Sequence, residues 1–182
     1  DVGLTLRESE QEATIEVISD RIFIDEAMAE VLTNAGANSQ PILSYFVNSI
    51  QFKDQKTPYS FVSTLPDLWL KKGEIIINTW LAEDLGVEPG DSIWLQYFLM
   101  GPLRELTVDS TEFVVKSIVV MDGYFGDKNL MPDIPGLSDA GNCRDWETGV
   151  PIKLDAIRDK DERYWTKWKG TPKAFISTSA GL

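Results

Sequence analysis

The chain has 182 residues, with 17 basic and 29 acidic side chains, so its net charge at pH 7 is −12. It contains no histidine and a single cysteine, Cys143. The lack of histidine excludes Ser-His-Asp and Cys-His nucleophiles within the chain, and histidine-ligated zinc, iron and haem. A single cysteine excludes an internal disulfide, a CxxC redox pair and a four-cysteine metal site. The chemistry that remains is that of carboxylates, lysine or tyrosine, or none.

Composition indicates a folded domain and narrows the range of partners. The hydrophobic fraction of 43% is sufficient for a core, and the charged fraction of 25% is ordinary. Because the acidic charge repels phosphate backbones and the basic residues are scattered, nucleic acid is not an expected partner. The chain begins without a signal-peptide pattern and has no run of about 18 apolar residues. It is therefore expected to be an excerpt of a larger protein, or else a mature chain after removal of a leader.

The first elements in chain order are predicted from alternating apolar residues. This period of two predicts strands over about 3–8 and 13–19 and a short strand over 22–24. Asp25 is predicted to cap a helix that continues to Ala35.

The middle of the chain is predicted to be mainly β-structure. Asn78 is predicted to cap a short helix over 79–85, which Gly86 ends. Pro89-Gly90 predicts a type II turn, because the glycine supplies the positive φ. Asp109-Ser110 is expected to separate two strands. The strands predicted here are those over 42–52, 59–64, 75–77, 92–99, 103–108 and 112–121.

Regular periodicity disappears between residues 122 and 153, where eight glycine and proline residues occur. A structureless stretch of this length is unusual inside a compact domain. We therefore expect either a mobile insertion or an ordered excursion that is packed by apolar side chains. These side chains are Leu130, Met131, Leu137 and Trp146.

Beyond this excursion, apolar residues from Leu154 to Trp168 lie at roughly helical spacing. Asp155 is the predicted N-cap of this helix, and a last strand is predicted over 174–176.

Together the elements predict an α+β fold, with residues 1–182 forming a single extracytoplasmic domain. We expect a mixed, mainly antiparallel sheet or partial barrel. Two or three short helices and the long irregular excursion at 122–153 complete this expected fold.

The acidic residues of the excursion invite a test for a cation site, because hard cations bind carboxylates on loops. The EF-hand spacing is absent, so a solvated acidic loop is favoured and no metal ligand is assigned. Cys143 lies beside Arg144, but without a base or a second thiol a part-buried structural thiol is favoured. The acidic residues are Asp122, Asp127, Asp133, Asp139, Asp145 and Glu147.

The tryptophans divide into two groups. Trp80 and Trp94 fall in predicted regular elements and are expected in or beside the core. Tyr164, Trp165 and Trp168 form a stripe on the charged last helix. This stripe either packs the helix on the sheet, which is favoured, or forms an exposed face that docks a partner. No catalytic or cofactor-binding residue is assigned.

The segment Glu74–Leu95, which contains LGVEPGD, resembles part of the MacB/FtsX-type ABC transporter permeases. In the extracytoplasmic core domain of that family, a strand, a short helix, LGxxxGD and a second strand follow one another. Further stretches resemble an FtsX-like permease subfamily and are spread over nearly the whole chain. They are Asp1–Arg7, Pro58–Ser60, Leu130–Asp133 with Pro135–Leu137, Asn142–Trp146 and Gly170–Phe175.

The resemblance implies a large loop between the first two membrane helices of a permease, on the extracytoplasmic (periplasmic) face. The permease would work with a cytoplasmic ATPase subunit by mechanotransmission, and a periplasmic protein or lipoprotein is a possible partner. The family supplies no catalytic residues, so the domain is expected not to be an enzyme and to need no cofactor.

Two other functions stay open from the sequence. A secreted or periplasmic module would bind sugar or peptide through Trp165 and Trp168. A carboxylate-dependent hydrolase would require two acids that face each other across a cleft, one of them with a raised pKa.

Overall fold

The computed structural model describes residues 3–8, 15–19, 24, 26–35, 39–66, 69–103, 105–147, 149 and 151–181. The chain divides into two compact units, residues 1–41 and 42–182, and each is considered by itself. The prediction that they act as one extracytoplasmic domain stays a prediction. None of the helices formed by the described residues has the length and apolarity that a membrane crossing requires.

The first unit contains an antiparallel hairpin, whose two strands the alternating pattern predicts, and the helix predicted to continue to Ala35. Arg7 forms an ion pair with Glu16 across the hairpin at 2.5 Å. The predicted cap Asp25 and residues 22–23 of the predicted short strand lie outside the described residues. The elements are β1 (Leu4–Glu8), β2 (Ile15–Ser19) and α1 (Glu26–Ala35).

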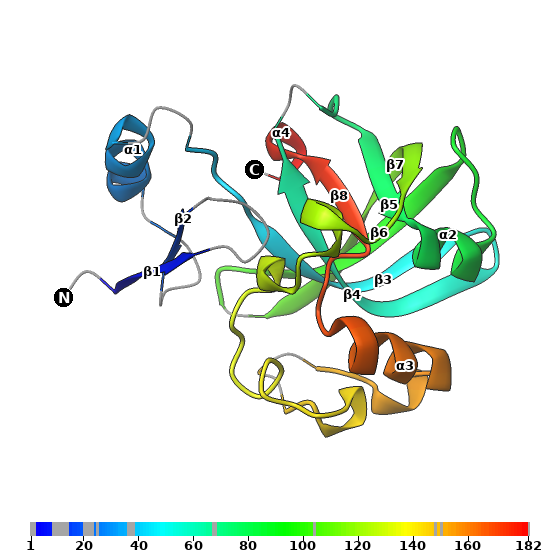
Figure 1. The fold of residues 1–182 in the computed structure, drawn as a ribbon. Coiled ribbons are helices and arrows are strands. Elements are labelled where there is room, and N and C mark those ends of the chain that lie inside the picture. Colours follow the sequence, from blue (N-terminus) through cyan, green and yellow to red (C-terminus); the bar gives the residue numbers. More distant parts are fainter. Residues whose placement is uncertain are drawn as a thin grey trace. The chain divides into compact units, whose positions relative to one another are not determined.

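The second unit is built on a closed six-stranded barrel in the order β3-β4-β8-β5-β7-β6 (Figure 1). Its strands are β3 (Ser44–Phe52), β4 (Gln55–Leu65), β5 (Glu74–Asn78), β6 (Ser92–Met100), β7 (Leu106–Val119) and β8 (Ala174–Ser177). The pairs β4–β8 and β5–β7 are parallel, and the other four neighbouring pairs are antiparallel. The predicted α+β class with a mixed, mainly antiparallel sheet is therefore confirmed.

The LGVEPGD segment folds as its residues predict. The Asn78 side chain accepts a hydrogen bond from the Leu81 N–H at 2.8 Å and caps α2 (Thr79–Leu85). Gly86 ends the helix with φ of 67°, and Gly90 has φ of 99°, a region that favours glycine. The Gly90 N–H donates to the Val115 carbonyl at 2.7 Å, which anchors the turn on β7.

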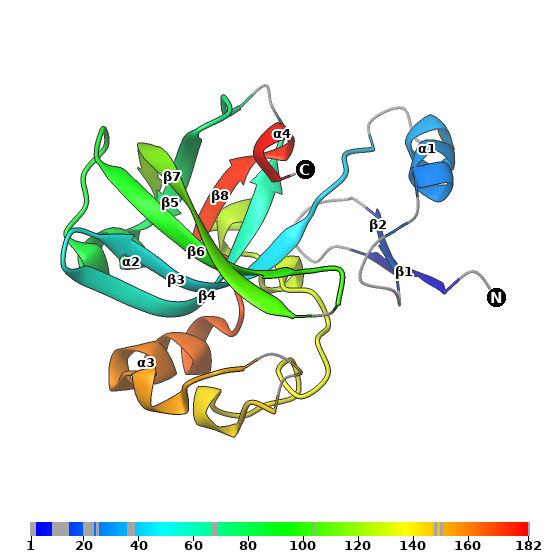
Figure 2. The same cartoon turned by 180° about the vertical axis from the view of Figure 1, so that it is seen from behind.

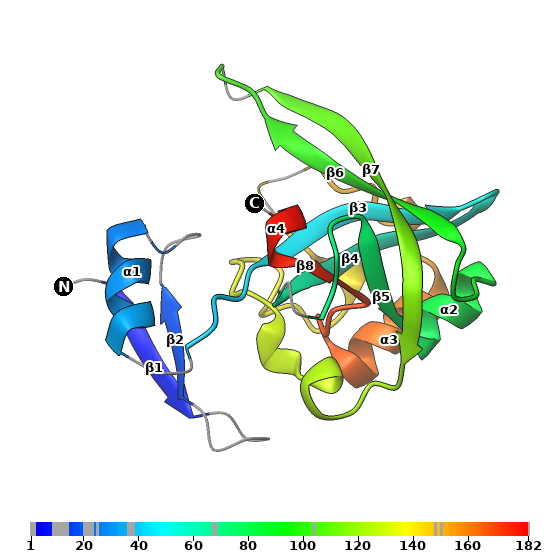
Figure 3. The same cartoon turned by 90° about the horizontal axis from the view of Figure 1, so that it is seen from above.

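Strands β6 and β7 continue beyond the rest of the barrel as a long hairpin (Figure 3). The predicted break at Asp109-Ser110 is wrong, because these residues pair with Tyr97 and Gln96 and β7 is continuous. Asp109 and Ser110 are exposed to solvent in β7, so their polar side chains do not destabilise the strand. Their polarity alone therefore did not indicate a turn. Trp94, expected in or beside the core, is 44% exposed. Its neighbours in β6 point into the barrel, and strand alternation turns Trp94 outward.

The excursion at 122–153 is ordered by packing on two outer surfaces of the barrel. Leu130 packs with Phe175, and Leu137 and Trp146 pack with Phe61. This confirms the ordered interpretation of the excursion. Its only regular elements among the described residues are short 3₁₀ turns, which are η1 (Gly123–Gly126), η2 (Lys128–Leu130) and η3 (Cys143–Asp145).

Helix α3 (Asp159–Trp168) lies on the same side of the barrel as the later part of the excursion (Figures 1 and 2). The predicted N-cap Asp155 is wrong, because Leu154–Ala156 forms a separate 3₁₀ turn, η4. Arg158 is extended, and its N–H donates to the Asp161 carboxylate at 2.9 Å, which fixes the true helix start. A fourth short helix that was not predicted, α4 (Thr178–Gly181), follows β8.

Candidate functional site

The aromatic stripe on α3 is mostly buried. The Trp165 ring packs edge-on against Trp146, with 5.0 Å between ring centres, and Tyr164 contacts Trp80 at 4.9 Å. Tyr164 and Trp165 are therefore part of the packing between α3 and the rest of the unit, as the favoured interpretation holds. An exposed docking face made of all three residues is not formed, because only Trp168 keeps accessible surface.

An ionic network around the buried carboxylate of Asp84 joins α3 to the barrel. The Arg158 guanidinium donates to both carboxylate oxygens of Asp161 and to Asp84 of α2, each at 2.7 Å. The Thr57 hydroxyl of β4 donates to Asp84, and Lys160 forms an ion pair with it. The Asp84 side chain is 2% exposed, so one buried carboxylate links β4, α2 and α3.

The electrostatics of this network keep Asp84 ionised. Burial raises the pKa of Asp84, but hydrogen bonds from Lys160, Thr57 and Arg158 outweigh it and hold the pKa below its usual value. Burial lowers the pKa of Arg158, whereas its two carboxylate partners raise it above the ordinary value. A hydrolase pair needs one carboxyl group with a raised pKa. Asp84 therefore does not act as the general acid of such a pair.

Lys173 lies buried beside this network, immediately before β8. Its ammonium group is 4.4 Å from the centre of the Trp80 ring and 4.7 Å from that of Tyr164. Burial lowers the pKa of Lys173 to about 8, although the nearby carboxylates of Asp161 and Asp84 oppose that shift. The cavity that Lys173 lines has a volume of about 20 Å³, which is room for a single water molecule and not for a substrate.

Cys143 lines the same small cavity and is buried. Burial and the carboxylate of Glu162 raise the pKa of the thiol to about 12, so it is protonated at neutral pH. Glu162 accepts hydrogen bonds from the backbone N–H groups of Cys143 and Arg144, at 3.0 and 3.1 Å. These contacts are those of a structural thiol on a segment that α3 holds in place.

Three of the six acids in the excursion stabilise the loop itself. Asp122 and Asp127 cap η1 and η2 by accepting backbone N–H groups, and Asp145 accepts the Asn142 amide at 2.9 Å. The solvated-loop interpretation is wrong for Asp127, which is buried, whereas Asp122 and Asp145 are exposed as well as hydrogen-bonded. In the part of the chain that the structure describes, no three carboxylate or thiol side chains are grouped to hold a metal ion.

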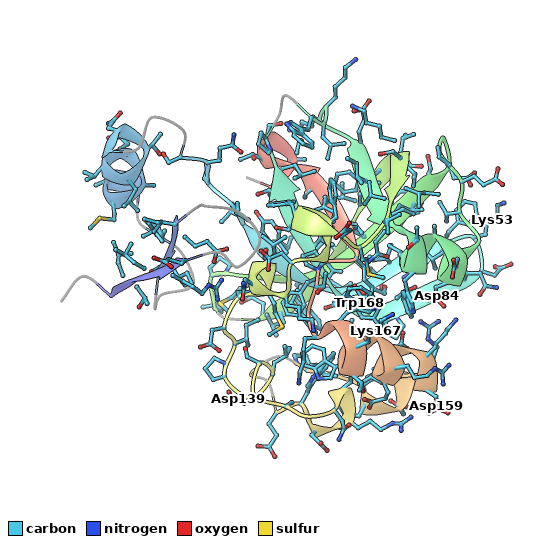
Figure 4. The ribbon with its side chains drawn as sticks, viewed as in Figure 1. Lys53, Asp84, Asp139, Asp159, Lys167 and Trp168 are labelled. Atoms are coloured by element: carbon cyan, nitrogen blue, oxygen red, sulfur yellow. The ribbon has the colours of Figure 1, made fainter. Side chains whose placement is uncertain are left out.

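A groove of about 330 Å³ is lined by residues of α2 and α3. Its volume falls within the range of small-ligand sites, about 300–1,000 Å³. Aromatic rings and cations share this lining, and Lys167 and Trp168 lie at the C-terminal end of α3 (Figure 4). The groove is the candidate functional site. Its main lining residues are Trp80, Glu83, Lys160, Arg163, Tyr164, Lys167 and Trp168.

The sequence predicted some of these residues and missed others. Tyr164 and Trp168 were singled out, and both line the groove. The cations were missed, although Lys160, Arg163 and Lys167 have the spacing of one helical face. The contact between Arg158 and Asp84 joins residues 74 positions apart, and no local pattern signals it.

Comparison with protein-family models gives no match for the chain, and comparison with curated proteins gives none either. The resemblance to ABC permeases therefore rests on the quoted residues. It stays a prediction.

Proposed function

We propose that the chain is a non-catalytic extracytoplasmic domain of an ABC transporter permease. It would couple helix movement, driven by a cytoplasmic ATPase subunit, to substrate export, lipoprotein handling or activation of a periplasmic partner. One observation carries the proposal: within residues 42–182, stretches that resemble permeases pack against one another. Tyr59 contacts Trp146 with 6.3 Å between ring centres, and Leu130 packs with Phe175. Lys173 lies over Trp80 of the LGVEPGD unit. Stretches far apart in sequence thus contact one another, as residues with a common structural role do.

The contact between α2 and the start of α3 also suits the transmission of force. Arg158 of the α3 cap and Asp84 of α2 are joined by charged hydrogen bonds, which are shorter and stronger than neutral ones. Removing one partner of such a buried pair costs about 3–5 kcal/mol. We therefore expect α3 and the barrel to move together as long as the work done on them is smaller than this cost. A displacement applied to the barrel would then reach whatever α3 contacts.

The reading frame around residues 1–182 tests the proposal. We expect apolar helices long enough to cross a membrane on both sides, and an ATPase gene next to the frame. The whole product, solubilised in detergent, should then copurify with that ATPase. A frame without such helices overturns the proposal, as does a product that fractionates away from membranes.

A secreted or periplasmic binding module is the second candidate, because the α2–α3 groove combines Trp80 and Trp168. Trp165, which this alternative also assigned to binding, is buried and unavailable. Quenching of tryptophan fluorescence by sugars or short peptides, and its loss in W168L, would support it. An unchanged spectrum across both ligand classes removes this candidate.

A further inference from the structure

We propose that the α2–α3 groove binds a compact organic anion, namely one or two carboxylates on an apolar or aromatic body. The carboxylate belongs either to a free small acid or to a short acidic peptide. This inference concerns the groove alone and does not depend on membership of the permease family. The reading-frame experiment and the binding experiment can therefore fail separately.

The charge of the groove is opposite to that of the whole chain. Lys160, Arg163 and Lys167 line it from one face of α3, and the acid in its lining is Glu83. The chain as a whole carries a net charge of −12. Arg163 and Lys167 are exposed, whereas Lys160 is shared with Asp84 of the buried network. Two accessible cations, one of them a planar guanidinium, suit a carboxylate ligand.

The walls of the groove also offer apolar surface. The half-buried rings of Trp80 and Trp168 and the half-buried Met121 contribute to its lining. The Lys167 ammonium lies 4.9 Å from the centre of the Trp168 ring. A carboxylate that pairs with Lys167 therefore brings its apolar body onto this ring.

The surroundings restrict the size of the anion. The open groove has a volume of about 330 Å³, enough for a small acid or a few side chains. An extended polyanion or an anionic bilayer would also experience the net charge of −12 and be repelled. A compact ligand is screened from acids farther away than a Debye length, about 8 Å at physiological ionic strength. The charge pattern thus favours a small anion over a surface.

Binding is measured by tryptophan fluorescence and calorimetry on the chain of residues 1–182, with 4-phenylbutyrate as the probe. The uncharged 4-phenylbutyramide is the matched control ligand, and an acetylated Glu-Phe dipeptide tests the peptide source. We expect saturable binding of an acid, at least about tenfold weaker binding of the amide, and weakening by salt. The proposal is overturned if neither 4-phenylbutyrate nor the dipeptide shows saturable binding. It is also overturned if 4-phenylbutyramide binds as tightly as 4-phenylbutyrate. Binding only to anionic lipid vesicles also overturns it.

Variants locate the ligand on the protein. R163Q and K167Q should each weaken binding by up to about fivefold, and together by about tenfold, because exposed ion pairs contribute up to about 1 kcal/mol. K53Q is the matched control, since Lys53 is also an exposed lysine over an aromatic ring, 4.4 Å from the centre of Phe52, and is outside the groove lining. K53Q should bind like the parent chain. Loss of affinity that is equal in K53Q and K167Q overturns the assignment to the groove.

Discussion

The barrel interior and the interface beneath α3 are both buried, but different forces hold them. Ile50, Ile77 and Ile93 fill the barrel with no exposed surface, and their cluster is apolar throughout. Beneath α3, Asp84 and Asp161 are buried together with aromatic rings. Apolar burial stabilises without fixing direction, whereas paired charges require a particular geometry. The barrel therefore supplies stability, and the ionic network determines where α3 lies.

The largest expected effect comes from removing the shared carboxylate. D84A removes the acceptor shared by Arg158, Lys160 and the buried Thr57 hydroxyl and leaves Arg158 with Asp161 alone. It should lower the free energy of unfolding by about 3–4 kcal/mol. Urea denaturation at pH 7 measures this change. D139N, which neutralises an exposed acid of the excursion, is the control and should stay near the parent value. Equal midpoints for D84A and D139N would show that the network contributes nothing.

A slightly smaller change in the free energy of unfolding is expected when pH removes the charge of Lys173. Its folded pKa of about 8 lies below the ordinary 10.5, so the buried cation lowers stability fully below pH 8. As pH rises from 8 towards 10.5, this penalty of about 3 kcal/mol disappears. The parent chain should therefore gain stability relative to K173M over that window, because other groups titrate in both chains. Urea midpoints at pH 7, 8, 9 and 10 test this, and parallel curves for the two chains contradict it.

A conservative change in the barrel should have a smaller effect that is independent of charge. I77V removes one buried methyl group and should cost about 1 kcal/mol. Because no ionisable group takes part, the cost should be the same at pH 7 and pH 9 and at low and high salt. Denaturation curves under these four conditions measure it. A cost that varies with pH would mean that barrel and network are not separate.

The smallest effect is expected for an exposed ion pair at the start of α3. Arg144 pairs with Asp159 at 2.9 Å, but both side chains are more than half exposed. R144A should therefore leave the urea midpoint unchanged, in contrast with D84A. A midpoint for R144A that falls as far as that of D84A would remove the distinction between surface and buried pairs.

Local chemistry made much of the fold predictable. Asn78, Gly86 and Gly90 each have a side-chain or backbone property that one position in a cap or turn requires, and the structure places them there. The start of α3 was misplaced because Asp155 is an ordinary capping residue by type. The contact that decides the helix start is the carboxylate of Asp161 accepting the Arg158 N–H. Arg158 is held in turn by Asp84, which no nearby residue reveals.

The sequence by itself determined the α+β class, the cap and turn of the LGVEPGD unit, and the absence of histidine chemistry. These follow from composition and from interactions within a few residues, which have the same form in any fold. Only the tertiary structure closed the barrel, joined Asp84 to Arg158 and gathered the cations of α3 opposite Trp80. Such contacts depend on side chains far apart in sequence, and their energies exist only once the chain has folded around them.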